Sequence, residues 1–230
     1  MKTRFLEFCI LAAFFLSLVN LTAAGLQDFW ELKPYTQWTA QEVEKLLLRD
    51  SPWTRTHRHE AYYTGGKITG KGTVRYVGGD WEPAAQIIIN WFAKPIREAA
   101  ARQMVLRNLD VLGAQLDEII NRDPRFIEIL VTDLPQARGN WAKGGNAEII
   151  KFKESTYLST KSAGKIPLSN MVMPKGWGDA LILQFVREMN GKTIVNEKDQ
   201  EVTLFIKIDT EVDRFIFNLK EMMIKGRLEI

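Results

Sequence analysis

Alternation of apolar and polar side chains in the C-terminal third limits the possible folds of this chain more than any other feature. Residues 202–208 alternate with the two-residue period of a half-buried β-strand. A second alternating segment, 215–219, follows an acidic turn. Upstream, Asn190-Gly191 joins two apolar segments, and this dipeptide is the strongest short-range signal for a β-hairpin. Consecutive strands joined by short turns predict an antiparallel meander.

Helical patterns lie mainly in the first half of the chain. Thr39 and Glu42 have the spacing of a capping box, which predicts a helix over 39–49. Pro95 suits the start of a second helix, and a change of apolar face near Asn108 predicts a break before a third. Further strands are predicted over 54–63, 73–77, 86–92 and 126–132. We therefore expect an α+β fold, an antiparallel β-sheet with a C-terminal meander and about three packed helices.

Residues 1–24 have the three parts of a secretory signal peptide. Lys2 and Arg4 supply the cationic start, and an apolar run follows that is too short to cross a bilayer as a helix. Thr22 and Ala24 are small residues at the positions that signal peptidase requires. We expect cleavage before Gly25 and an exported product, periplasmic or extracellular. The alternative is an uncleaved segment retained as an N-terminal anchor.

Removal of the signal peptide changes the composition of the mature chain. Cys9, the sole cysteine, leaves with the signal, so the mature chain cannot form a disulfide and must rely on its core. Removing Lys2, Arg4 and Glu7 leaves 29 basic and 27 acidic residues, a charge balance that does not favour nucleic acid. We expect residues 25–230 to form a single soluble α+β domain without a membrane span.

The glycine-rich segment Gly65–Gly72 nearly matches the phosphate-binding P-loop. That motif needs a hydroxyl residue directly after its lysine and a helix immediately downstream. Gly72 stands at the hydroxyl position, and a strand pattern follows instead of a helix. We interpret the segment as a hairpin loop rather than a nucleotide site.

His57 and His59 are the only histidines, and on a strand they would point to the same side. Two imidazoles in this spacing can bind one metal ion, but the remaining ligands would have to be carboxylates or water. Arg55 and Arg58 would also repel a cation. The sequence therefore favours solvated histidines over a metal site.

Tryptophan is abundant for a chain of this length. Exposed indoles can stack on sugar rings, although most tryptophans are core anchors. Trp38, Trp53 and Trp91 lie within apolar patterns and are predicted to be buried. The remaining indoles near glycines are the better surface candidates for sugar binding, namely Trp81, Trp141 and Trp177.

Groups of carboxylates could act as general acid and base, but their separation decides the chemistry and a sequence does not give it. The absence of a mature cysteine excludes thiol catalysis, and no serine stands in a nucleophile elbow. We assign no catalytic, cofactor-binding or metal-binding residue and expect no cofactor. A role in surface solubility or in turn formation explains each of these groups. They are Glu42 with Glu44, Asp117 with Glu118, and Asp209 with Glu211 and Asp213.

Several phrases together resemble an uncharacterised family of exported bacterial proteins of the acidobacterial type. These phrases span nearly the whole mature chain, so the resemblance implies one domain; it implies no activity. They are Trp38-Thr39 with Glu42, Val43 and Lys45; Asp50-Ser51-Pro52-Trp53; Trp91 with Pro95-Ile96-Arg97-Glu98-Ala99; Lys165-Ile166-Pro167; and Leu219-Lys220-Glu221-Met222 with Gly226, Leu228 and Glu229.

Two functional hypotheses follow from the sequence. The first is a non-enzymatic envelope or secreted protein, a binding or structural module for an envelope or extracellular partner. The second is a secreted hydrolase. In one version of this hypothesis the enzyme is metal-dependent, with His57 and His59 as metal ligands. A convergent polar pocket that contains the histidines and two carboxylates would favour the hydrolase.

Overall fold

The computed structural model describes residues 28–49, 51–59, 63–64, 80–81, 85–109, 113–121, 125–132, 140–174, 180–208 and 211–230. The predicted signal peptide, the glycine-rich segment 65–72, the predicted strand 73–77, Trp177 and Asp209 lie outside the described residues. The chain divides into two compact units, residues 1–37 and residues 38–230. The described part of the first unit contains the short helix α2 (Phe29–Leu32) and the 3₁₀ turn η1 (Tyr35–Gln37).

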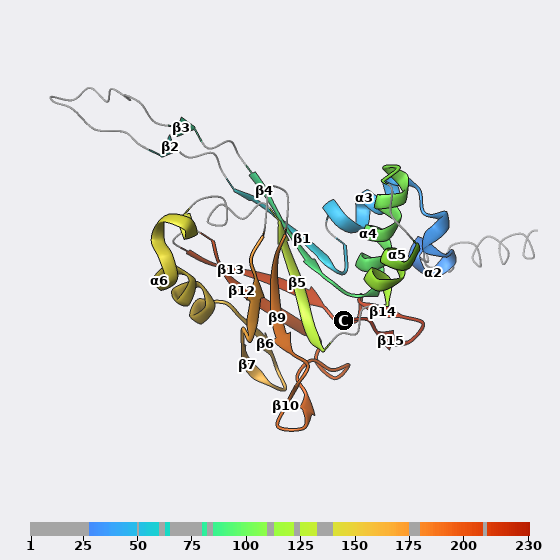
Figure 1. The fold of residues 1–230 in the computed structure, drawn as a ribbon. Helices are drawn as coiled ribbons and strands as arrows, with labels where there is room; N and C mark the ends of the chain where they lie inside the picture. The colour runs from blue at the N-terminus through green and yellow to red at the C-terminus, as the bar shows by residue number, and fades with distance from the viewer. Residues whose placement is uncertain are drawn as a thin grey trace, which may run out of the picture. The chain divides into compact units, whose positions relative to one another are not determined.

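Two antiparallel sheets form the body of the second unit (Figure 1). The five-stranded sheet has the order β1 (Thr54–His59), β4 (Ala85–Trp91), β5 (Phe126–Thr132), β9 (Leu181–Val186) and β8 (Asn170–Val172). The four-stranded sheet has the order β13 (Glu211–Asn218), β12 (Glu201–Ile208), β6 (Tyr157–Thr160) and β7 (Gly164–Pro167). Three two-stranded ribbons complete the described strands: β2 (Tyr63–Thr64) with β3 (Asp80–Trp81), β10 (Glu188–Met189) with β11 (Lys192–Thr193), and β14 (Met223–Ile224) with β15 (Arg227–Leu228).

The main core lies between the two sheets. Strand alternation gives each sheet an apolar inner face, and the aromatic rings of Trp91 and Phe217 meet across the interface with their centroids 5.4 Å apart. At the β1 edge, the Arg55 guanidinium lies over the Phe217 ring and donates a hydrogen bond to the Ile216 carbonyl at 2.7 Å. The inner positions of β4, β5 and β9 are fully buried: Ile87, Ile89, Ile127, Ile129, Val131, Leu181, Leu183 and Phe185.

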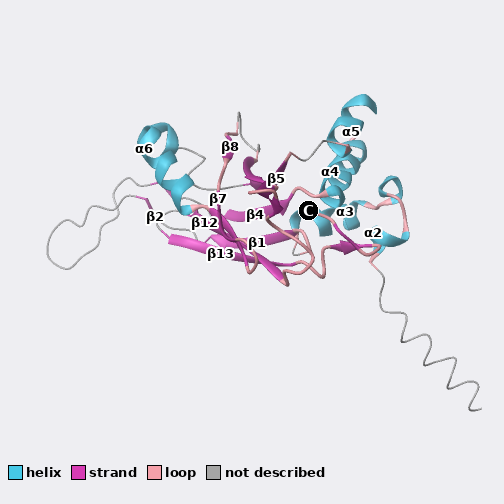
Figure 2. Ribbon diagram, turned by 90° about the horizontal axis from the view of Figure 1, so that it is seen from below, coloured by secondary structure: helices cyan, strands magenta, loops and turns pink. Residues whose placement is uncertain are grey.

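The helices lie at the two ends of this body. Three of them, α3 (Ala40–Leu48), α4 (Lys94–Leu106) and α5 (Gly113–Ile120), form a group at one end, and α6 (Asn140–Ser155) lies at the other (Figures 1 and 2). Helix α3 packs on α4 and on β1, and α4 packs on α5. In the described part of the chain, no helix is long and apolar enough to cross a membrane.

Most sequence expectations for the fold are confirmed. The α+β class, the antiparallel pairing and the packed helices are present, and β5 has the predicted bounds. Helix α3 begins with the capping box: Thr39 Oγ1 accepts from the Glu42 backbone N–H, and Glu42 Oε2 accepts from the Thr39 N–H at 2.8 Å. Asn190 and Gly191 both have positive φ, as their turn requires, and Asn108 has a φ of 52° at the predicted break.

Two features of the architecture go beyond these expectations. The C-terminal strands do not share one sheet, because β9 pairs in the five-stranded sheet whereas the hairpin β12–β13 belongs to the four-stranded sheet. The predicted strand over 54–63 is shorter: β1 ends at His59, and β2 begins at Tyr63.

Candidate binding cleft

A row of polar side chains crosses the outer face of the five-stranded sheet. Asn170 on β8 is paired in register with Gln184 on β9, and Gln184 is paired with Glu128 on β5. Phe92, directly after β4, lies beside this row, because its backbone N–H donates to the Glu128 carbonyl at 2.8 Å. Alternation places these side chains opposite the apolar inner face. The fold therefore brings together residues that are far apart in the sequence.

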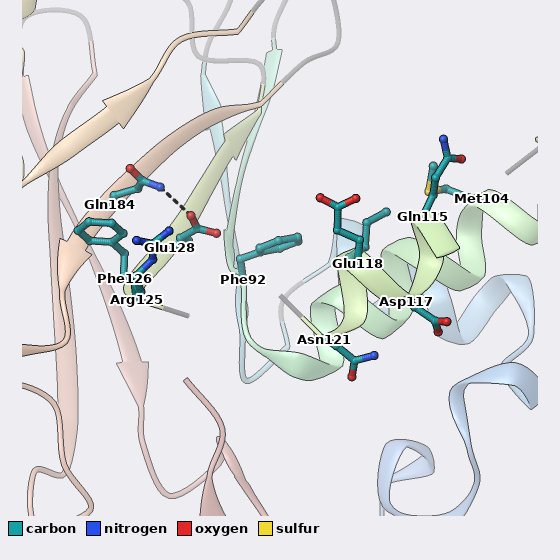
Figure 3. A pocket seen from close by; sticks show the side chains of 11 residues that line it. Phe92, Met104, Gln115, Asp117, Glu118, Asn121, Arg125, Phe126, Glu128 and Gln184 are labelled. Carbon is teal, nitrogen blue, oxygen red and sulfur yellow. Dashed lines mark hydrogen bonds between the residues drawn. The ribbon is translucent and has the colours of Figure 1, made fainter. Parts of the chain in front are cut away.

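Hydrogen bonds fix the order of donors and acceptors in this row. Asn170 Nδ2 donates to Gln184 Oε1 at 2.8 Å, and Gln184 Nε2 donates to Glu128 Oε1 at 2.7 Å. Gln184 is 8% exposed, so its amide is held in one orientation by neighbours rather than by water. The bond from Gln184 holds the Glu128 carboxylate on the outer face of β5, the middle strand of the sheet (Figure 3).

Helix α5 faces this row from the other side of a cleft. The Arg97 side chain, on α4, connects α5 to the sheet: its Nε donates to the Ile120 carbonyl at 3.2 Å, and its Nη1 donates to the Phe92 carbonyl at 3.3 Å. A guanidinium at a helix C-terminus satisfies carbonyls that the helix itself leaves unpaired and opposes the negative end of its dipole. Arg97 thus sets the distance between the end of α5 and the sheet.

The cleft between these walls has a volume of about 1150 Å³. Its sheet side is lined by Phe92, Arg125, Phe126, Glu128 and Gln184. Its helix side is lined by Gln115, Asp117, Glu118, Ile119 and Asn121 of α5 and its C-terminal turn, and by Met104 of α4. In Figure 3 the Glu118 side chain lies on the side of α5 nearer Phe92 and its carboxylate points upward in the view, whereas Asp117 points away from the sheet. Aromatic rings, amides and carboxylates together suit a polar organic ligand.

A smaller hollow of about 410 Å³ lies on the four-stranded sheet. It is lined by Ser159, Thr160, Lys161, Gln200, Glu201 and Thr203. Nearby on the same outer face, the Tyr157 and Phe205 rings stack with their centroids 4.5 Å apart. Lys165 Nζ lies 4.4 Å from the Tyr157 ring centroid. Because Phe205 and Lys165 already pack on the Tyr157 ring, this hollow offers a ligand less aromatic surface than the cleft.

The carboxyl of Glu98 lies outside the cleft but has a shifted pKa. Burial raises the pKa of Glu98 above its usual range; Lys94 opposes this shift, Glu229 adds to it, and Arg97 opposes it. Lys94 Nζ is 3.9 Å from Glu98 Oε1, too long for a strong hydrogen bond. Glu98 therefore belongs to the packing between α4 and the residues near 229 rather than to a binding site.

The structure does not bring His57 to the cleft. His57 is half-buried on the inner side of β1, and its ring meets Phe215 edge-on with centroids 6.0 Å apart. His59 ends β1, and its side chain lies outside the described part. Within the described residues, no group of three or more His, Cys, Asp or Glu side chains could hold a metal ion.

Three tryptophans occupy the predicted core positions. Trp38 is 1% exposed, and Trp53 and Trp91 are fully buried. Trp53 Nε1 donates to the Glu229 carbonyl at 2.9 Å, whereas the buried Trp91 Nε1 has no hydrogen-bond partner among the described residues. The side chains of Trp81, Trp141 and Trp177, the proposed sugar-binding candidates, are not among those described.

The candidate carboxylate groups separate in the structure. Glu42 belongs to the cap of α3, and Glu44 forms an exposed ion pair with Arg49 at 2.8 Å. Asp117 and Glu118 line the cleft, so the interpretation of this pair as surface charge is incomplete. Asp213 is half-buried on β13, and the side chains of Asp209 and Glu211 are not described.

Sequence reasoning missed the residues that centre the site. Glu128 is the only charged residue of β5 and Gln184 is the only polar residue of β9, and that contrast with their apolar neighbours was a signal in the sequence. Their pairing could not be seen, because it depends on the register between β5 and β9.

No family model matches the chain, and neither a curated protein nor a solved structure matches it. The geometry of the cleft must therefore carry the functional argument.

Proposed function

We propose that the protein is an exported, non-enzymatic binding module whose cleft receives a polar organic ligand of the envelope or extracellular space. The hydrogen-bonded row Asn170–Gln184–Glu128 is the main support. Its polar groups are oriented by the protein before any ligand arrives, which lowers the entropy lost on binding. The flanking Phe92 and Phe126 rings supply apolar surface for the carbon skeleton of a ligand.

The hydrolase hypothesis receives less support. Its metal-dependent form needs His57 and His59 beside carboxylates, and His57 packs against Phe215 instead of lining the cleft. A metal-free form would use Glu118 and Glu128, which lie on opposite walls. Carboxylates alone do not make a hydrolase, because one must hold a proton at working pH and both must reach the scissile bond.

Export is the second part of the proposal and rests on the pattern of residues 1–24. We expect the protein recovered from the envelope fraction to begin at Gly25 or within a residue or two of it. Intact-mass measurement tests this expectation. A mass that includes Met1 would contradict cleavage and leave the retained anchor as the explanation.

Ligand capture by the cleft can be tested with thermal unfolding in the presence of a panel of small polar metabolites. Ligands that bind the folded state raise the unfolding midpoint. Gln184→Leu removes the centre of the polar row, and we expect it to abolish these shifts. Gln200→Leu makes the same chemical change in the smaller hollow and should preserve them. Shifts that persist in Gln184→Leu would contradict the assignment of the cleft, and recovery of a ligand in cleaved form would favour the hydrolase.

A further inference from the structure

We infer that the outer face of the four-stranded sheet docks on the surface of an anionic phospholipid bilayer. This inference goes beyond the proposed function, because this face and the cleft belong to different sheets. The two sheets pack by their inner faces, so their outer faces point in opposite directions. A docked protein would therefore keep its cleft turned away from the bilayer.

Strand register shows which side chains of this sheet point outward. Leu204 of β12 is paired with Phe215 of β13, and both are buried in the core between the sheets. Alternation places the next residue on either side of each of them on the outer face. We call the outward set that carries the inference the basic face: Tyr157, Lys165, Phe205, Val212, Arg214 and Ile216.

Two aliphatic side chains of β13 are open to water on the basic face. Val212 is 48% exposed and Ile216 is 36% exposed. Arg214, which is also exposed, occupies the outward position between them. At a bilayer interface, apolar groups enter the boundary between headgroups and acyl chains, while cations on long side chains stay at the level of the phosphates. The outward side of β13 has this composition.

A row of side chains crosses the basic face from strand to strand. Arg214 is paired in register with Phe205, and Phe205 is paired with Tyr157. The two rings stack with their centroids 4.5 Å apart. Beyond them, on β7, Lys165 Nζ lies 4.4 Å from the Tyr157 ring centroid. The row therefore has a cation at each end and aromatic rings in the middle.

The packing of this row favours a lipid surface over a sugar polymer or a nucleic acid. Sugars and bases stack on the open face of an aromatic ring. Phe205 covers the Tyr157 ring on the β12 side, and the Lys165 ammonium lies over it from the β7 side. The ring edges remain for a partner, and tyrosine edges suit the headgroup level of a bilayer.

Charge makes an anionic bilayer the better partner. Among the outward residues of these four strands whose side chains the structure describes, the cations are Lys165, Lys207 and Arg214, and the one carboxylate is Glu201. Lys207 has a further contact within the fold, so the inference rests on Lys165 and Arg214. Anionic lipids attract such cations at close range. A second copy of the chain is less suitable, because a twofold contact would gather the cations of both copies in one interface.

Vesicle co-sedimentation of the mature protein tests the inference. Two lipid compositions are compared: phosphatidylcholine alone, and phosphatidylcholine with phosphatidylglycerol in equal parts. The protein should sediment with the anionic vesicles at low salt, sediment less as salt is added, and stay in solution with the neutral vesicles. Equal sedimentation with both compositions, or sedimentation with neither, would overturn the inference.

Charge variants test whether the basic face makes the contact. Arg214→Gln and Lys165→Gln should each weaken partitioning onto the anionic vesicles about fivefold, because each removes one cation from the lipid surface. Lys192→Gln removes the same charge from an exposed residue of β11, outside this sheet, and should leave partitioning within about twofold. An equal loss in all three variants would indicate attraction to net charge alone and overturn the inference.

A variant of the aliphatic residues tests the apolar part of the contact. Threonine keeps the β-branched shape of valine and isoleucine and suits a strand, so Val212→Thr combined with Ile216→Thr should fold. We expect this double variant to bind the anionic vesicles about fivefold more weakly. Val172→Thr makes the same kind of change on an exposed residue of β8 in the other sheet and should have no effect. Unchanged binding of the double variant would contradict docking by this face.

Other occupants of the basic face would give different results. Retention on polygalacturonate beads without sedimentation on vesicles would identify an anionic glycan. A dimer in sedimentation velocity that Val212→Thr with Ile216→Thr dissociates would identify a second copy of the chain. Either result would overturn the inference. Neither result bears on the cleft, which Gln184→Leu tests separately.

Discussion

The two faces of the five-stranded sheet are built from neighbouring residues of the same strands, yet different forces hold them. Ile129 and its inner neighbours are excluded from water by the second sheet. One residue away on β5, Glu128 belongs to a polar row beside a cleft. The inner face is stabilised by transfer of apolar surface from water, which depends on area more than on direction. The outer face depends on directional bonds, so it can recognise a ligand.

The outer face itself has two halves. At the end covered by α3, the Thr54 hydroxyl donates its one proton to the Leu46 carbonyl, and the side-chain amide of Asn90 lies within hydrogen-bond distance of the same hydroxyl. Thr54 is fully buried, and Asn90 is nearly so. Toward α5, similar polar groups line the cleft instead. The comparison suggests that covering helices decide whether polar outer residues serve stability or binding.

The largest expected effect tests the two faces at adjacent positions. Ile129→Ala should lower the free energy of unfolding by about 3–4 kcal/mol, because it leaves a cavity in a closed core. Leu130→Ala, on the half-buried outer side, should cost only about 1 kcal/mol. Urea denaturation of both variants measures the difference. Equal losses would mean that the outer face is packed as densely as the core.

An intermediate effect tests the covered half of the outer face. Leu46 lies in the last turn of α3, where the helix cannot satisfy its own carbonyls, and Thr54 supplies the missing donor. Thr54→Val should therefore cost about 2 kcal/mol, since it buries an unsatisfied acceptor. Thr54→Ser keeps the hydroxyl and should cost less. If the serine variant is the less stable of the two in urea denaturation, packing rather than hydrogen bonding dominates here.

The smallest effect concerns pH and the helix layer beside the outer face. The pKa of Glu98 is higher in the folded protein than in the unfolded chain, so folding takes up a proton between the two values. The free energy of unfolding should fall as pH rises through that interval and stay lower above it. Glu98→Gln should remove this loss and be the more stable protein at neutral pH. Thermal unfolding from pH 4 to pH 8 measures it, with Glu154→Gln as the control. An unchanged pH profile in Glu98→Gln would show that its carboxyl is not the cause.

Local signals predicted local structure well. The cap of α3, the bounds of β5 and the turn at Asn190-Gly191 depend on residues within one short segment. Helix α6 was missed because Gly144-Gly145 lies inside it, and glycine disfavours a helix interior. The candidate site was not predictable at all, since Glu128 and Gln184 meet only through strand register set by the whole core.

The order in which the chain visits the two sheets has a consequence for folding kinetics. Along the sequence, β5 of the five-stranded sheet is followed by β6 and β7 of the four-stranded sheet. The next strands, β8 and β9, belong to the five-stranded sheet again, and β12 and β13 belong to the four-stranded sheet. Neither sheet is therefore encoded by a continuous segment, because strands of the other sheet interrupt each of them along the sequence. Loops must close at an entropic cost before such non-local pairs form, which slows folding to about milliseconds or seconds. We expect a single cooperative refolding event, preceded by a long-lived chain with unpaired strand edges that is prone to aggregate.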